Sequence, residues 1–142
     1  MTDPSPPCAI DTNFILRYLV GDVPGQLRAA REVLADLDSG SQRAVCDPVI
    51  LAEVVYVLTS HYELRREEAA ELLLSLVKAS GLVMHDKKRY VHALELFATS
   101  VPHFADACAC AAALEQCEGR LYSFDRKLSK VEGLTRLERV IE

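Results

Sequence analysis

Short apolar runs alternate with longer segments of helical periodicity along this chain. The short runs are expected to be strands at 8–10, 44–46, 82–84 and 121–122. The segments between them are expected to be helices over about 12–20, 26–38, 48–60, 66–79, 87–99 and 103–117. Strands that alternate with helices form a parallel sheet covered by helices on both faces. The pattern therefore predicts an α/β fold, in which ligand sites form beyond the carboxyl ends of the strands.

Capping residues support these helix assignments. Thr12 is expected to cap the first helix, Asp47 precedes a proline at the start of the third, and Asp86 precedes the helix at 87–99. Glycines, which readily adopt the left-handed conformation, follow three of the helices at Gly21, Gly81 and Gly119.

Length and composition fit one globular domain. The chain has 142 residues, of which 50% are hydrophobic and 26% charged, so a packed core is expected rather than disorder. Residues 1–7 are proline-rich, lack the basic and apolar regions of a signal peptide, and are expected to be a disordered lead-in to a single domain over 8–142. No apolar run reaches the ~18 residues of a membrane span, so a cytoplasmic protein without membrane contact is expected.

The number and spacing of the five cysteines also fit a cytoplasmic protein. Their number is odd, and none forms a CxxC pair of the kind that structural zinc sites use. Cys108, Cys110 and Cys117 fall within an alanine-rich helical stretch. We expect the thiols to act as small buried hydrophobic groups rather than as metal ligands or disulfides.

Two acidic residues lie within apolar helical segments. Glu53 has apolar neighbours one turn away on both sides, including Val49 and Tyr56, so it is expected to be buried. Asp106 shares its helix face with Ala109 and Cys110. A buried carboxylate without a partner costs several kcal/mol or more, so each acid is expected to serve a ligand or a partner.

Two further acids, Asp11 and Asp125, directly follow predicted strands. Each acid taken singly is also explained as an N-cap or as half of a salt bridge, for example with Arg17 or Arg126. Four carboxylates, however, can converge and stay ionised only around a cation. Oxygen ligands of this kind suit Mg²⁺ or Mn²⁺, so the four together favour a metal site.

Several motifs occur together in a fixed order: Asp11-Thr-Asn13 after the first strand, Glu53 in its hydrophobic helix, Phe104-Ala-Asp106-Ala, and Ser123-Phe-Asp125. In this order and spacing they resemble the PIN-domain ribonucleases, and in particular the VapC-like toxins of bacterial type II toxin–antitoxin systems. The segments 17–22 and 127–134 are also similar to that group. The resemblance covers nearly the whole chain from residue 8.

The resemblance implies a three-layer α/β/α fold with a mainly parallel central sheet, and hydrolysis of single-stranded RNA with one or two Mg²⁺ or Mn²⁺ ions. The positions that match the family's catalytic and metal-binding acids are Asp11, Glu53, Asp106 and Asp125. The positions that match its supporting hydrogen-bonding groups are Asn13 and Ser123. The implied partners are the RNA substrate, an antitoxin protein and a second copy of the chain in a homodimer. Asp47 departs from the family, which often carries Ser or Thr there.

In this hypothesis the ions bind phosphate oxygens and lower the pKa of a bound water, so no basic side chain is needed. His103 lies one turn before Asp106 and could reach a metal, but packing or a contact at the helix start is favoured. Arg126 and Lys127 are candidate phosphate contacts, although a solvated helix face explains them equally well.

Two alternatives use the same acids differently. A phospho-acceptor receiver domain is also α/β, but it needs paired acids after the first strand and a lysine at a late strand end, and neither is present. A metal-free interaction module would not need four converging carboxylates. The net charge of −5 weakly opposes nucleic-acid binding, yet 16 Lys and Arg residues remain to contact phosphates.

The segment 12–20 holds six large apolar residues and one charge, more than one buried face of a short helix needs. One explanation is a helix enclosed entirely in the core. The other is that part of this surface, together with 26–38, forms a groove for an apolar inhibitor helix or a self-association patch.

Overall fold

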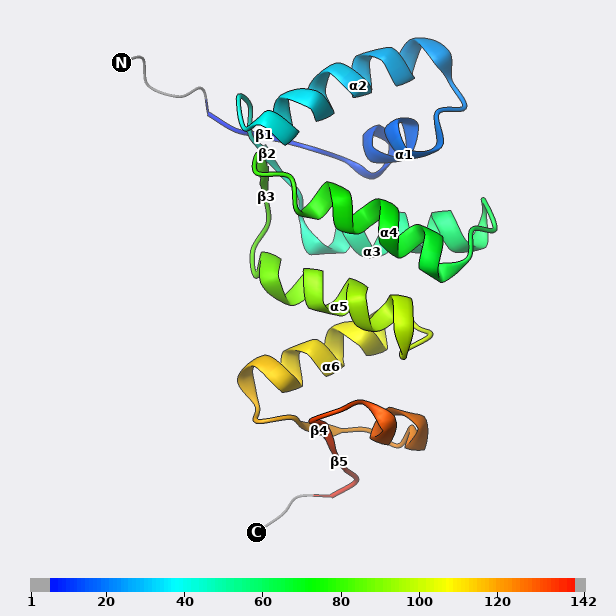
Figure 1. Cartoon of the computed structure of the whole chain (residues 1–142), viewed down its shortest axis with the longest axis vertical. Helices are drawn as coiled ribbons and strands as arrows, with labels where there is room; N and C mark the ends of the chain where they lie inside the picture. Colours follow the sequence, from blue (N-terminus) through cyan, green and yellow to red (C-terminus); the bar gives the residue numbers. More distant parts are fainter. Residues whose placement is uncertain (1–5, 140–142) are drawn as a thin grey trace.

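A computed structural model of the chain describes residues 6–139 (Figure 1). The first half contains β1 (Cys8–Ala9), α1 (Thr12–Val20), α2 (Pro24–Ser39), β2 (Ala44–Val45), α3 (Pro48–Ser60) and α4 (Arg66–Val77). The second half contains β3 (Leu82–Val83), α5 (Lys87–Thr99), α6 (Phe104–Gln116), β4 (Arg120–Tyr122), the 3-10 helix η1 (Arg126–Lys130) and β5 (Thr135–Leu137). Most of the expected lead-in, residues 1–5, lies outside the described residues.

The described strands pair in parallel, which confirms the predicted α/β class. They form two sheets: β1, β2 and β3 lie side by side in that order, and β4 pairs with β5. In Figure 1 the β4–β5 pair lies beyond α6, at the opposite end of the molecule from α1 and α2. The parallel strands are therefore divided between two short sheets instead of one continuous sheet.

The helices supply the core because each buries one apolar face. The central layer contains Leu58 of α3, Leu73 of α4 and Leu94 of α5, all fully buried. The rings of Phe97 and Phe104 meet edge to face at 5.7 Å and join α5 to α6. Within residues 6–139 no polar or charged residue is fully buried, and no helix is long and apolar enough to cross a membrane.

The predicted helix caps are partly confirmed. Asp47 caps α3 by accepting the backbone N–H of Val49 at 2.9 Å. The prediction for Thr12 is wrong: α1 begins at Thr12, and the preceding Asp11 provides the cap. Asp86 occupies the N-cap position of α5, but its carboxylate pairs with Arg89 at 3.3 Å rather than capping the helix within the described chain.

Two glycines are required for different reasons. Gly21 ends α1 with φ 70°, the left-handed conformation that was predicted. Gly81 does not adopt that conformation, so the prediction for it is wrong. It packs so closely on the carbonyl oxygen of Gln42 that a Cβ atom would collide with it.

Candidate active site

An aspartate occupies the N-cap position after each of the first four strands. These residues are Asp11, Asp47, Asp86 and Asp125. Asp11 accepts the backbone N–H of Phe14 at 2.9 Å, and Asp125 accepts that of Lys127 at 3.0 Å. Each bond uses one carboxylate oxygen, and the other oxygen has no hydrogen-bond partner among residues 6–139. Asp11 and Asp125 therefore combine a structural role with a free oxygen that faces solvent.

Glu53 is exposed, so the prediction that it is buried is wrong. Its neighbours on the same side of α3 share this exposure: Val49 is 69% exposed and Tyr56 is 67% exposed. The helix turns its other face, with Val54 and Leu58, into the core. The carboxylate of Glu53 is thus solvated, and the large apolar side chains of Val49 and Tyr56 beside it are exposed as well.

Asp106 and Asp125 act on a common neighbour, the thiol of Cys110. Burial raises the pKa of the Cys110 thiol, and the negative charges of Asp106 and Asp125 raise it further. Asp106 lies half-buried in the first turn of α6, whereas Asp125 comes from the loop between β4 and η1. The helix α6 packs against β4, the strand that precedes Asp125.

The described residues do not bring three or more Asp, Glu, His or Cys side chains into a group that could hold a metal ion. The four predicted acids therefore match Mg²⁺ or Mn²⁺ in their donor chemistry but not in their spacing. Asp106 and Asp125 are the two whose charges reach a common atom.

The two predicted supporting residues differ in their surroundings. The hydroxyl oxygen of Ser123 accepts the backbone N–H of Asp125 at 3.0 Å, so Ser123 orients the loop that carries the acid. Asn13 is exposed on α1, and its side chain has no hydrogen bond to the described part of the chain.

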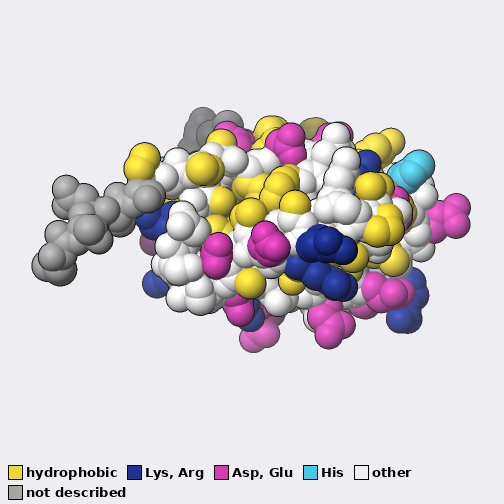
Figure 2. Space-filling model, turned by 90° about the horizontal axis from the view of Figure 1, so that it is seen from above, with side chains coloured by type: hydrophobic (Ala, Val, Ile, Leu, Met, Phe, Trp, Pro, Cys, Tyr) yellow, Lys and Arg dark blue, Asp and Glu magenta, His cyan; other side chains and the backbone are white. Residues whose placement is uncertain are grey.

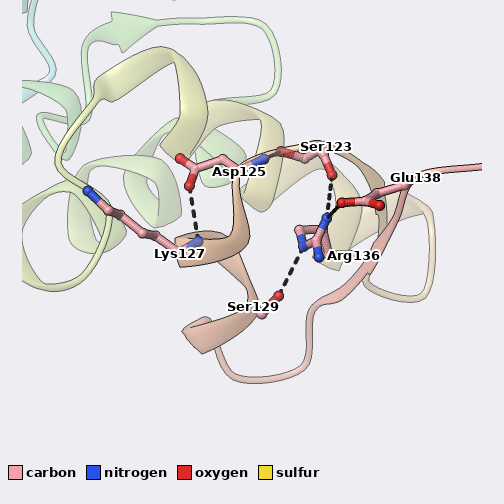
Figure 3. Close-up of polar contacts among 6 residues, drawn as sticks. All are labelled: Ser123, Asp125, Lys127, Ser129, Arg136 and Glu138. Carbon is pink, nitrogen blue, oxygen red and sulfur yellow. Dashed lines mark hydrogen bonds and ion pairs between the residues drawn. The ribbon is translucent and has the colours of Figure 1, made fainter.

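Arg136 of β5 is a supporting residue that sequence reasoning missed (Figure 3). Its guanidinium donates to the carbonyl oxygen of Ser123 at 2.9 Å and to the hydroxyl of Ser129 at 3.1 Å. It also pairs with Glu138 at 2.6 Å. Nothing in the sequence indicated this role, because β5 is a short, mostly polar strand without an apolar run.

Two hollows lie on the surface near these elements. A cavity of about 540 Å³ between β1, α1 and α2 has Asp11 and Asp36 at its lining, together with apolar Ile10, Phe14 and Val33. A second, of about 870 Å³, is lined mainly by apolar residues of α3, α5 and the segment 102–108. None of the four predicted acids lines the second hollow, although Val49 and Tyr56, the neighbours of Glu53 on α3, do.

His103, two basic residues of η1 and the five cysteines differ in their exposure to solvent. His103 occupies the N-cap position of α6, but its side chain is exposed and makes no capping hydrogen bond, so the favoured packing or helix-start contact is not observed. Arg126 and Lys127 are exposed on η1. All five cysteines are free thiols: Cys46 and Cys110 are buried, Cys108 is half-buried, and Cys8 and Cys117 are exposed, contrary to the expected burial.

The family model for the PIN domain matches residues 8–134, nearly the whole described chain. The chain therefore belongs to the PIN domain family, whose members are generally nucleases and typically depend on divalent metal ions. This match confirms the resemblance at the level of the family. A comparison with curated proteins finds none that matches the chain.

Proposed function

We propose that this protein is an Mg²⁺- or Mn²⁺-dependent endoribonuclease that hydrolyses phosphodiester bonds of single-stranded RNA. The observation that carries the proposal is the match of residues 8–134 to the PIN domain family. It is supported by the negative charges of Asp106 and Asp125, which both raise the pKa of the Cys110 thiol. The proposed catalytic and metal-binding set is Asp11, Glu53, Asp106 and Asp125.

The side chains of this set are suited to a hard divalent cation. Asp11 and Asp125 each keep one oxygen free while the other caps a helix, so a ligand role does not cost the cap. Glu53 is exposed and can reach a ligand without breaking a buried contact. Since four carboxylates repel one another unless a cation lies between them, we propose that binding of the ion draws the set together.

Purified protein should cleave single-stranded RNA when Mg²⁺ or Mn²⁺ is supplied, and EDTA should stop the reaction. Asp106→Asn should abolish cleavage while the protein stays folded, because the amide keeps the size of the side chain but removes its charge. Divalent ions should raise the melting temperature of the wild type by mass action, and less so that of Asp106→Asn. RNA cleavage that persists both in EDTA and in the Asp106→Asn variant would contradict the proposal.

We further propose that the protein is the toxin of a type II toxin–antitoxin pair, active in the cytoplasm as a homodimer. The cavity of about 540 Å³ supports an inhibitor site, because its apolar lining by Phe14 and Val33 suits an apolar helix. Asp11 and Asp36 at the same cavity would attract a Lys or Arg of that helix. Figure 2, seen from the end with α1 and α2, shows hydrophobic side chains gathered between acidic and basic ones on this face.

A further inference from the structure

An exposed aromatic pair lies at the end of β4 and in the loop that follows it, directly before Asp125. Tyr122 is 62% exposed, and Phe124, at 82%, is more exposed than any other large hydrophobic residue of the described chain. We call this pair the β4 platform. Half-buried Ser123 separates the two exposed residues. Residues two positions apart lie within roughly 7 Å of each other along the chain, so the two aromatic residues are neighbours on the surface.

The backbone on both sides of Phe124 is held in place. The carbonyl oxygen of Ser123 accepts a hydrogen bond from Arg136 at 2.9 Å, and the Ser123 hydroxyl accepts one from the backbone N–H of Asp125 at 3.0 Å. Asp125 in turn accepts the N–H of Lys127 (Figure 3). The ring of Phe124 is thus presented to solvent from a fixed loop, although it contributes little to the core. A rigid, exposed apolar ring is typical of a binding surface.

The charge around the β4 platform differs in sign from that of the whole chain. Residues 119–139 hold six Lys and Arg but only three acids, whereas the chain carries a net charge of −5. Arg126, Lys127 and Lys130 are exposed on η1 and form no ion pair with any residue of the range 6–139. In Figure 3 the side chain of Lys127 extends away from the cluster around Arg136. An occupant of this surface should therefore carry negative charge as well as flat apolar groups.

We infer that the β4 platform stacks unpaired bases of single-stranded RNA, while Arg126, Lys127 and Lys130 contact its phosphates. Bases supply flat faces that stack on aromatic rings, and phosphates supply negative charges that pair with Lys and Arg. Proteins that bind single-stranded nucleic acids generally combine these two kinds of contact. The inference rests on the proposed function, and it assigns Phe124 and Tyr122 the role of positioning residues that hold the RNA beside Asp125. Because a paired base cannot stack on a side chain, the platform also selects single strands over duplexes.

The test is the binding of a short, fluorescently labelled single-stranded RNA in EDTA, so that no cleavage is needed. Phe124→Ala should weaken binding on the order of tenfold, and the double variant with Tyr122→Ala should weaken it further. Phe124→Tyr should restore affinity because it keeps the aromatic face, whereas Phe124→Leu should not. Leu72→Ala, an exposed apolar residue of α4, is the matched control and should bind as the wild type does.

Two readouts separate stacking from a structural role. A 2-aminopurine base in the RNA should lose fluorescence on binding to the wild type but not to Phe124→Ala, and the melting temperature of the two proteins should agree. Arg126→Ala with Lys130→Ala should reduce the slope of log affinity against log salt by about 1.4, because each phosphate contact contributes about 0.7. The control pair Arg28→Ala with Arg31→Ala, exposed on α2, should leave the slope unchanged.

Wild-type affinity of Phe124→Ala would overturn the inference, as would a lower melting temperature or the dissociation of a dimer on this substitution. The last two results would mean that the ring packs within the protein or against a second copy. If the wild type cleaves RNA and Phe124→Ala binds and cleaves equally well, only this inference is lost. If binding depends on the ring but no metal supports cleavage, only the proposed function is lost.

Discussion

The guanidinium of Arg136 donates a hydrogen bond to the carbonyl oxygen of Ser123 at 2.9 Å, which connects β5 to the residue that follows β4. The Arg136 side chain is only 17% exposed. The same group also reaches Ser129 of η1. One side chain thereby fixes the loop in which Phe124 and Asp125 lie.

Replacing Arg136 by methionine should destabilise the protein. The substitution keeps the apolar stem but removes the bonds to Ser123 and Ser129, so the free energy of unfolding should fall by about 1–3 kcal/mol. Urea unfolding followed by circular dichroism measures this loss. Arg139→Met, at an exposed position of the same segment, is the control and should stay within about 0.5 kcal/mol of the wild type. Equal stability of the two variants would show that the Arg136 contacts do not hold the loop.

The cysteines should divide into two classes of reactivity. Burial raises the pKa of the Cys46 thiol to about 11 and that of Cys108 also to about 11. At neutral pH both are therefore almost entirely protonated, and a thiol reacts only as the thiolate. Exposed Cys8 and Cys117 should react rapidly with a disulfide reagent, whereas all five thiols should react after unfolding. Rapid reaction of Cys46 in the native protein would contradict its burial.

Glu53→Gln should separate catalysis from stability. Because Glu53 is exposed and forms no ion pair within residues 6–139, the substitution should change the free energy of unfolding by no more than about 0.5 kcal/mol. RNA cleavage should nevertheless be lost, because a proposed metal ligand loses its charge. Glu71→Gln on α4 is the matched exposed control and should retain activity. A large loss of stability in Glu53→Gln would mark a structural ion pair instead.

The proposed inhibitor site links partner binding to metal binding. If a cation of the inhibitor reaches Asp11 in the cavity between α1 and α2, Mn²⁺ should compete with it. Titration of Mn²⁺ should then weaken the apparent affinity of a cognate inhibitor peptide, and Asp11→Asn should remove the competition. An inhibitor affinity that does not change with Mn²⁺ would mean that the inhibitor binds elsewhere.

Solution scattering of the free protein should give the mass of a dimer, and the mass of a monomer at micromolar concentration would contradict the proposed homodimer.

The sequence predicted the long elements well because their apolar periodicity is strong. The expected ranges 12–20, 48–60 and 87–99 are those of α1, α3 and α5. It failed at η1 and β5, whose few apolar residues leave no periodic pattern. The division of the strands into two sheets also could not be read from the sequence, since strand pairing depends on contacts between distant segments.

The sequence singled out the candidate site residues, which remain a prediction, but it did not give their surroundings. Burial of Glu53 was inferred from apolar neighbours, on the assumption that a helix hides every large side chain. The structure instead leaves Val49 and Tyr56 uncovered. Thr12 and Asp11 are adjacent residue types that both favour N-cap positions, so the sequence alone does not decide between them; in the structure Asp11 is the cap, through one carboxylate oxygen.

The central claim is that Asp11 and Asp125 act as metal ligands and not only as helix caps, and Asp47 provides the matched control. All three accept a backbone N–H at 2.9–3.0 Å, and asparagine caps a helix about as well as aspartate does. The decisive measurement is therefore RNA cleavage with Mn²⁺ by the three Asp→Asn variants, each with its melting temperature. We predict that all three keep wild-type stability, that Asp11→Asn and Asp125→Asn lose cleavage by at least about a hundredfold, and that Asp47→Asn retains it. Equal activity of the three variants would contradict the account and leave these aspartates as caps alone.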